Sequence, residues 1–198
     1  PESHSLLATS GDGALSVFDL NAKGGPTMDT VSDYMEEELL SLEVIKGQTK
    51  VVCGTQDGVL GVFKWGQWAD VSDRVPGHPS SVESILKLDE DTIITGSSDG
   101  LIRIMQLYPN KLLGVVGDHD EFPIEKIAMS HDRHLLASCS HDSTVQFWDI
   151  KFLTEDDGED DEGEDDDEAG EDDDDEAMDG GAGGDDRGEQ GGDFFGDL

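Results

Sequence analysis

One short sequence pattern recurs four times along the chain, and its spacing constrains the fold more than any other feature. Each copy runs from an apolar stretch through small residues to an aspartate and then into a second apolar stretch. The aspartates are separated by 45, 42 and 43 residues; they are Asp12, Asp57, Asp99 and Asp142. A period of 40 to 45 residues is typical of one four-stranded blade of a β-propeller. The sequence therefore predicts an all-β chain of consecutive blades.

Each repeat aspartate marks a hairpin turn. Glycine follows three of the four aspartates, and Asp-Gly suits a tight turn because both residues accept positive φ. The positions three, five and six residues after each aspartate are apolar: Leu15, Leu60, Ile102 and Val145; Val17, Val62, Ile104 and Phe147; Phe18, Phe63, Met105 and Trp148. The first two sets share one strand face and the third lies on the opposite face, because side chains alternate along a strand. We expect neighbouring blades to cover both faces.

Further apolar stretches predict the other strands of each blade. Inner strands are expected at 39–45, 82–88 and 124–129, and short outer strands at 71–75 and 111–116. Residues 24–38 are expected to form a long loop with a weak outer strand. The first copy opens too close to the start of the chain to have an inner strand of its own. We therefore expect three nearly complete blades and a partial first blade, taken from a larger ring and less stable than that ring.

The composition changes abruptly near residue 153. Residues 154–198 hold 24 acidic residues and one basic residue, Arg187, whereas residues 1–153 hold 24 acidic and 11 basic residues. Dense like charge with little apolar surface cannot offset the entropy of ordering. The sequence thus predicts a folded domain over 1–153 and a disordered, acidic, Gly-rich tail over 154–198. Such a tail either only improves solubility or attracts basic proteins such as ribosomal proteins or histones, and it repels nucleic acid phosphates.

The end of the tail carries three apolar residues, Phe194, Phe195 and Leu198. Apolar anchors on a charged tether are typical of a short docking motif. We therefore expect this segment to bind a partner, and deletion of residues 193–198 should then remove at least one partner from a pull-down.

Cysteine use and hydropathy predict a reduced, soluble, intracellular protein. Cys53 and Cys139 are the only cysteines and form no Cys-x-x-Cys pair, so neither a disulfide scaffold nor a structural zinc site is expected. No apolar run approaches the roughly 20 residues that a membrane helix needs, and Pro1 begins no signal sequence.

The repeats resemble the WD40 repeat family over roughly residues 6–151. Trp148-Asp149 matches the closing dipeptide of that family, Gly77-His78 matches its opening dipeptide, and Asp118-His119 is a degenerate form of the opening. The resemblance implies a buried hydrogen-bonded set in the last blade, formed by His119, Ser138, Asp142 and Trp148. It implies a partial set in the preceding blade, formed by His78, Thr95 and Asp99, with Met105 in place of tryptophan. Buried polar groups of this kind need hydrogen-bond partners.

These polar residues allow two chemical alternatives. Ser138 with a histidine and an aspartate could indicate nucleophilic catalysis, but no nucleophile elbow surrounds it and the same turn recurs in four blades. His131, His134 and His141 could indicate a metal site, but residues 130–134 fall where the repeat turns between its first two strands. Cys139 is expected to be a small packed residue. We therefore expect no catalytic residues, no metal and no cofactor.

The residues within the four copies resemble the WD repeat-containing protein 55 family more than a generic propeller. The stretches that carry this resemblance are 6–13, 52–58, 63–65, 72–74, 95–103, 109–110, 114–117 and 135–149. The resemblance implies a ring of seven blades and a scaffold that binds proteins during maturation of ribosomal RNA precursors. It implies that the protein is localised in the nucleolus and nucleus, and it leaves an additional cytoplasmic localisation open.

The same resemblance implies an alternative, a substrate receptor of a cullin-4 ubiquitin ligase. Plant members are linked to the adaptor of that ligase, for which a Trp-Asp-x-Arg signature is expected. This chain has Trp148, Asp149 and Lys151 at the matching positions. Lysine keeps the charge of arginine but lacks its planar fork, which weakens bidentate recognition.

Overall fold

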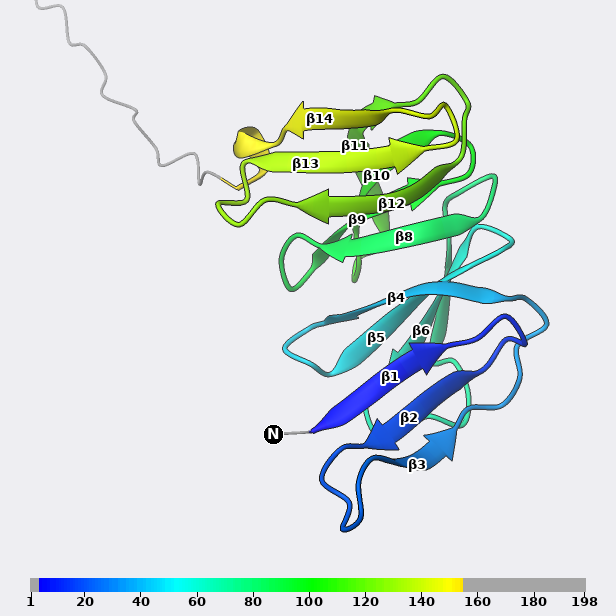
Figure 1. The fold of residues 1–198 in the computed structure, drawn as a ribbon. Coiled ribbons are helices and arrows are strands. Elements are labelled where there is room, and N and C mark those ends of the chain that lie inside the picture. Colours follow the sequence, from blue (N-terminus) through cyan, green and yellow to red (C-terminus); the bar gives the residue numbers. More distant parts are fainter. Residues whose placement is uncertain (1–3, 155–198) are drawn as a thin grey trace, which may run out of the picture. The chain divides into compact units, whose positions relative to one another are not determined.

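A computed structural model describes residues 4–154 (Figure 1). These residues form fourteen strands and one short 3-10 helix. The elements are β1 (Ser5–Thr9), β2 (Leu15–Asp19), β3 (Thr27–Val31), β4 (Leu39–Ile45), β5 (Lys50–Thr55), β6 (Val59–Lys64), β7 (Asp73–Pro76), β8 (Val82–Lys87), β9 (Thr92–Ser97), β10 (Leu101–Gln106), β11 (Lys111–Asp118), β12 (Ile124–Met129), β13 (Leu135–Ser140), β14 (Val145–Asp149) and η1 (Lys151–Leu153). The predicted tail state and the docking motif at Phe194, Phe195 and Leu198 lie outside the described residues. Within residues 4–154, no helix is long and apolar enough to span a membrane.

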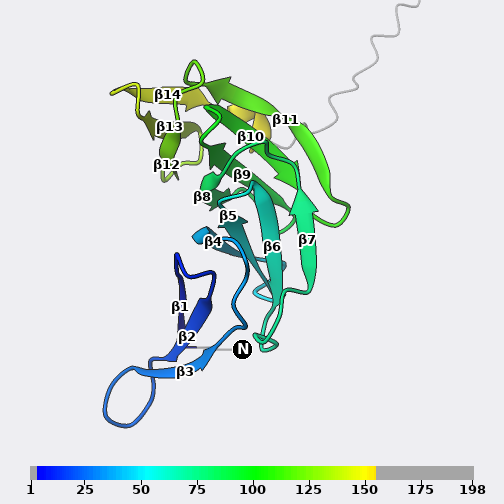
Figure 2. The ribbon, with the colours of Figure 1, turned by 90° about the vertical axis from the view of Figure 1, so that its right-hand side faces the viewer.

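The strands form four antiparallel sheets, which follow one another in chain order (Figures 1 and 2). The second sheet has the order β4-β5-β6-β7, and the third has the order β8-β9-β10-β11. The inner strands β4, β8 and β12 contact one another across neighbouring sheets. The predicted all-β fold is confirmed, with the inner strands at the expected positions and β3 within the long 24–38 segment. We call the sheets blades 1 to 4.

The end blades have three strands each among the described residues. Blade 1 contains β1, β2 and β3 and has no inner strand, as the sequence predicts. Blade 4 contains β12, β13 and β14 and has no outer strand beside β14, which the repeat pattern alone did not indicate.

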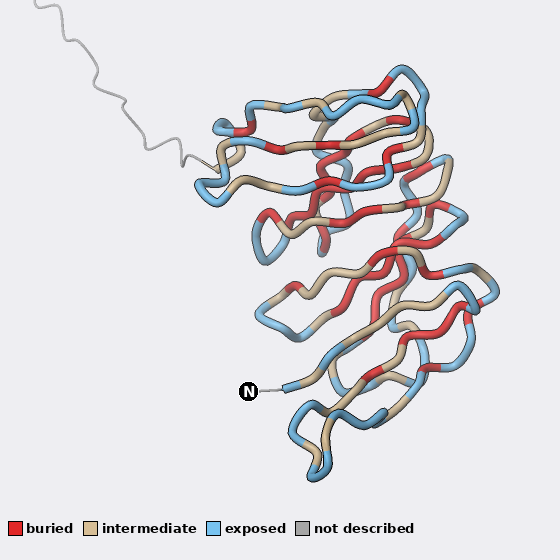
Figure 3. The backbone as a smooth tube through the Cα atoms, in the orientation of Figure 1, coloured by how far each residue is buried: buried red, intermediate tan, exposed pale blue. Residues whose placement is uncertain are grey.

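Apolar side chains fill the space between each pair of neighbouring blades. Blades 1 and 2 enclose one cluster that includes Leu15, Leu39 and Phe63, all nearly inaccessible to solvent. Blades 2 and 3 enclose a second cluster, and blades 3 and 4 a third that includes Ile102 and Leu136. Burial is therefore most continuous along the strands of the middle blades (Figure 3). The period-two pattern of the sequence is what directs these side chains into the spaces between blades.

Neighbouring blades cover both faces of blades 2 and 3, whereas one face of blade 4 is open, as an open partial ring implies. Val145 and Phe147 are 59% and 70% exposed, whereas Leu60 and Ile102, the equivalents of Val145 in blades 2 and 3, are fully buried. The physical reason is that no described blade packs against that face of blade 4. Leu135 lies on the same open face and is 45% exposed.

The Asp-Gly turns of the first three blades lie under the loop that enters the next blade. In blade 3, Gly100 has a φ of +85°, and a Cβ there would lie 2.9 Å from backbone atoms of Glu121. In blade 4 the equivalent residue is Ser143, which also has positive φ but is exposed. Glycine is therefore required where the next loop covers the turn, and serine is tolerated where it does not.

Replacing Gly100 with alanine should lower the free energy of unfolding by about 2 kcal/mol, because it adds strain at positive φ to a backbone collision. Urea denaturation of the full-length protein would measure this loss. Ser143→Gly is the matched control, since it relieves strain at an open turn and should be neutral or slightly stabilising. Equal losses for the two variants would contradict the steric account of the repeat turns.

Candidate functional site

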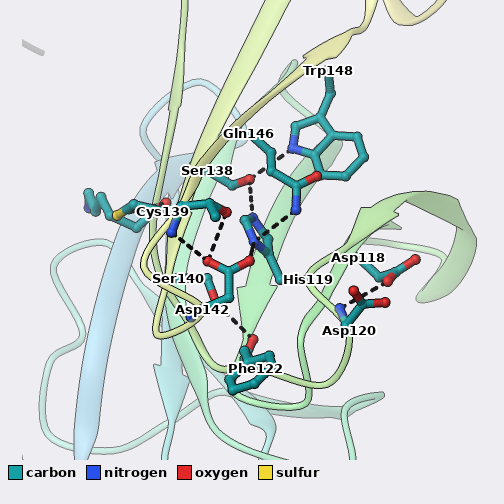
Figure 4. Close-up of polar contacts among 12 residues, drawn as sticks. Asp118, His119, Asp120, Phe122, Ser138, Cys139, Ser140, Asp142, Gln146 and Trp148 are labelled. Atoms are coloured by element: carbon teal, nitrogen blue, oxygen red, sulfur yellow. Dashed lines mark hydrogen bonds and ion pairs between the residues drawn. The ribbon is translucent and has the colours of Figure 1, made fainter.

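The most organised polar site in the described chain is in blade 4, where four side chains from separate elements meet (Figure 4). His119 follows β11 in the loop that enters the blade, Ser138 lies on β13, Asp142 lies in the β13–β14 turn and Trp148 lies on β14. His119 Nε2 is 2.7 Å from Ser138 Oγ, and His119 Nδ1 is 2.6 Å from Asp142 Oδ2. Trp148 Nε1 donates to Ser138 Oγ at 2.8 Å. The structure thus brings together all four residues of the set that the resemblance implies.

The directions of these hydrogen bonds follow from the donors available. The indole N–H of Trp148 can only donate, so Ser138 Oγ accepts from it and directs its own proton toward His119 Nε2. Nδ1 of His119 then carries the ring proton and donates to Asp142. Asp142 also accepts from the backbone N–H of Thr144 at 2.7 Å, which shapes the turn. The hydrogen bond from His119 is the main reason that the pKa of Asp142 is lowered to about 2, and the carboxylate is therefore ionised at neutral pH.

The connectivity Ser138, His119, Asp142 is that of a nucleophilic triad, but its surroundings are those of a structural staple. Ser138 and His119 are each only 1% exposed. Ser138 Oγ already accepts a hydrogen bond from Trp148, so the oxygen has no free approach for a substrate carbonyl. The geometry therefore favours a role in joining the loop, the turn and two strands of the blade.

Blade 3 differs from the expected partial set. His78 and Thr95 are together, with Nε2 2.8 Å from Oγ1. Asp99, however, faces Arg103, whose two terminal nitrogens donate to its carboxylate at 3.0 and 2.5 Å. His78 Nδ1 is buried and has no hydrogen-bond partner among residues 4–154. Asp99 is therefore diverted from His78, and Met105 packs in the core where tryptophan stands in blade 4.

Sequence reasoning missed two serines that join neighbouring blades. Ser41 Oγ on β4 donates to the carbonyl oxygen of Val82 at 2.9 Å. Ser84 Oγ on β8 accepts from the backbone N–H of Ile127 at 3.3 Å. Both serines occupy the third position of an inner strand, and this shared position was the available signal.

The three candidate metal-binding histidines do not converge. His141 Nε2 is 2.6 Å from Glu125, and His134 Nδ1 is 3.8 Å from Asp132. Across residues 4–154, no group of three or more His, Cys, Asp or Glu side chains is placed to share a metal ion. His131 and His134 do fall in the loop between β12 and β13, as the repeat pattern predicts.

Both cysteines are free thiols. Burial raises the pKa of Cys53 to about 12, so this thiol is not a nucleophile at neutral pH. Cys139 is partly buried on the open face of blade 4, with Sγ 3.7 Å from the carbonyl oxygen of Lys126.

The three residues of the possible adaptor signature are not equally accessible. Trp148 is partly buried and packs against the core of blades 3 and 4. Asp149 and Lys151 are exposed, and Asp149 Oδ1 accepts from the backbone N–H of Lys151 at 3.0 Å. Only the charged pair is therefore presented to solvent.

Exposed carboxylates lie on two of the three loops that cover the Asp-Gly turns. The β3–β4 loop, which contacts the turn of blade 1 at Gly13, exposes Asp33, Glu36 and Glu38. The β11–β12 loop, which covers the turn of blade 3, exposes Asp118, Asp120 and Glu121. We call these two loops the acidic rim.

Comparison with known proteins places the chain in one family. A family model described as WDR55 matches residues 1–153. The chain is similar to WD repeat-containing protein JIP5 of Cryptococcus neoformans var. neoformans serotype D, at 46% identity over 78% of this chain and 41% of the relative. It is similar to WD repeat-containing protein 55 of Arabidopsis thaliana, at 43% identity over 78% of this chain and 43% of the relative. The Mus musculus protein of the same name is 36% identical over 77% of this chain and 39% of that protein.

The chain thus spans about two fifths of the length of the curated relatives that it matches. The match covers all four blades, including the turn aspartates and the polar set of blade 4. By sequence, the chain belongs to the WD repeat-containing protein 55 family.

Proposed function

We propose that the protein is a non-catalytic, protein-binding scaffold that acts in ribosome production, with the nucleolus and nucleus as its place of action. One observation carries this proposal: the carboxylates of the acidic rim are exposed, whereas the polar set of blade 4 is buried. Carboxylates on exposed loops are available to partners, whereas Ser138 and His119 are each 1% exposed and are occupied with one another.

The charge of the chain indicates the kind of partner. The formal net charge is −36, and Arg74, which pairs with Glu37 at 3.4 Å, supplies one of the few cations beside the rim. Fields of one sign speed the encounter with partners of the opposite sign and repel phosphates. Basic proteins, such as those that assemble on ribosomal RNA precursors, fit this surface better than RNA itself.

Affinity purification of the full-length protein tests this proposal. We expect pre-ribosomal proteins to co-purify with the wild-type protein and to be reduced when Glu36 and Glu38 are changed to glutamine. Changing the exposed Asp29 and Asp70, which lie outside the rim, to asparagine is the control with the same change of charge and should leave recovery unaltered. Equal recovery from all three proteins would contradict a role for the rim, and the absence of pre-ribosomal proteins from the wild-type sample would contradict the proposed function.

The exposure of Asp149 and Lys151 supports one second candidate, the substrate receptor of a cullin-4 ligase. In that case the cullin-4 adaptor should co-purify, Lys151→Arg should increase its recovery and Lys151→Glu should abolish it. A purification that contains pre-ribosomal proteins and no adaptor, with either variant, rules this candidate out.

A further inference from the structure

Blades 3 and 4 each contain a histidine, a hydroxyl residue and an aspartate at equivalent positions, but the hydrogen bonds of these residues differ between the two blades. In blade 4, Asp142 accepts from His119. In blade 3, Asp99 forms two hydrogen bonds with Arg103, and His78 Nδ1 has no partner in the described chain. The two blades thus present two arrangements of one repeat unit.

The residue four positions after the turn aspartate differs between the two arrangements and contacts the aspartate or the histidine in each. Arg103 lies four residues after Asp99, and the residue four after Asp142 is Gln146. Gln146 Nε2 lies 3.2 Å from His119 Nδ1 and leaves Asp142 to the histidine. Arg103 is 7% exposed, and its guanidinium fork occupies both oxygens of Asp99. A bidentate Arg–carboxylate pair is stronger than a neutral hydrogen bond, so arginine holds the carboxylate.

The tautomer of His78 follows from its one hydrogen bond. The Thr95 hydroxyl donates to the carbonyl oxygen of Arg103 at 3.5 Å, so Thr95 Oγ1 accepts from His78 Nε2–H. Nδ1 is then unprotonated and is the atom at which a proton would be taken up. His119 has the opposite tautomer, with the proton on Nδ1.

Few charged groups face His78. Arg103 and Asp99 come from its own blade, and blade 2 contributes the turn at Gly58, whose carbonyl oxygen accepts from the His78 backbone N–H at 3.3 Å. The pKa of His78 is lowered to about 4, mainly by burial and also by the positive charge of Arg103, whereas a hydrogen bond to the backbone of Gly58 and the charge of Asp99 act in the opposite direction.

We propose that blade 3 contains a proton-operated latch in which Arg103 and His78 compete for the carboxylate of Asp99. When His78 Nδ1 takes up a proton from solvent, it becomes a buried donor that requires an acceptor, and Asp99 is the carboxylate within its own set. Asp99 then moves from Arg103 to His78, and blade 3 gains the hydrogen bond between histidine Nδ1 and the turn aspartate that is seen in blade 4. The loop at His78 rests on the turn of blade 2, so the latch lies at the joint between the two blades.

The latch weakens the joint as the solution becomes acidic. His78 in the unfolded chain titrates near 6.5, whereas the folded state holds the pKa at about 4. The contribution of neutral His78 to stability is therefore complete above about pH 6.5 and is lost as the pH falls from 6.5 toward 4.

Nitrogen NMR of the full-length protein with ¹⁵N-labelled histidine tests the latch. In the wild-type protein we expect His78 to be the Nε2–H tautomer with a pKa well below the ordinary value, and His119 to be the Nδ1–H tautomer. In Arg103→Gln, which copies Gln146 of blade 4, His78 should change to the Nδ1–H tautomer and its pKa should rise by more than one unit. An unchanged tautomer and pKa in Arg103→Gln, or an ordinary pKa in the wild-type protein, would overturn the proposal.

Two further variants separate the latch from a general loss of packing. Gln146→Arg should transfer the arginine fork to blade 4, so that Nδ1 of His119 loses its proton and the ring changes to the Nε2–H tautomer. Arg103→Lys keeps the positive charge without the fork, so the pKa of His78 should rise less than in Arg103→Gln. If either glutamine or lysine at 103 prevented folding, the tautomer of His119 in Gln146→Arg would still decide the matter, because an unchanged tautomer would contradict the competition for the carboxylate.

Discussion

Replacing Gly117 with alanine is expected to lower the free energy of unfolding by about 4 kcal/mol. A Cβ at this position would lie 2.1, 2.4 and 2.5 Å from three ring atoms of Trp148. The indole cannot move aside freely, because its Nε1 donates to the buried Ser138. Displacement of the ring would break that hydrogen bond and disturb the core between blades 3 and 4.

The same strand offers a matched control. Gly114 also lies on β11, and a Cβ there would meet no atom within 4 Å. Gly114→Ala should therefore leave the free energy of unfolding nearly unchanged or raise it slightly. Urea denaturation monitored by tryptophan fluorescence would compare the two variants. Similar stabilities for both alanine variants would show that Trp148 does not pack on Gly117 as described.

Replacing Ser138 with alanine is expected to lower the free energy of unfolding by about 3 kcal/mol. The hydroxyl is the common partner of His119 Nε2 and Trp148 Nε1, so its removal leaves two buried polar atoms without their partner. An unsatisfied buried polar group costs about 1 to 3 kcal/mol.

Blade 3 supplies the control for this prediction, because Thr95 occupies the position equivalent to Ser138 and its hydroxyl is also hydrogen-bonded to Nε2 of the histidine in its blade, His78. Ser138→Thr keeps the hydroxyl and should retain most of the stability. Thermal or urea denaturation of the full-length protein would distinguish the two. A loss for threonine as large as that for alanine would indicate that shape, rather than the hydroxyl, determines stability at this position.

Much of the fold could be predicted because each copy of the repeat specifies both its hairpin turn and the alternation of its strands. The turn aspartates fix the hairpins, and the alternation of apolar residues fixes which side chains enter the spaces between blades. The inner strands at β4, β8 and β12 followed from apolar stretches at the same place in each period. The family resemblance then supplied the four members of the polar set in blade 4.

What could not be predicted depends on neighbours that the repeat pattern does not identify. Phe147 has the same apolar character as Val62 and Ile104, yet it is exposed because no described blade covers it. Asp99 has the same place in the repeat as Asp142, yet it pairs with Arg103. The position four residues after the aspartate varies among the copies, so a repeat pattern gives it little weight even though it decides where the carboxylate binds.

Rapid depletion of the protein in cells, followed by pulse labelling of ribosomal RNA, tests the central claim most directly. If the chain belongs to a scaffold for ribosome production, precursor ribosomal RNA should accumulate and mature ribosomal RNA should fall within one labelling period. The wild-type protein should restore maturation, and the Gly114→Ala variant should restore it equally well. Unchanged processing of ribosomal RNA after complete depletion would contradict the proposed function.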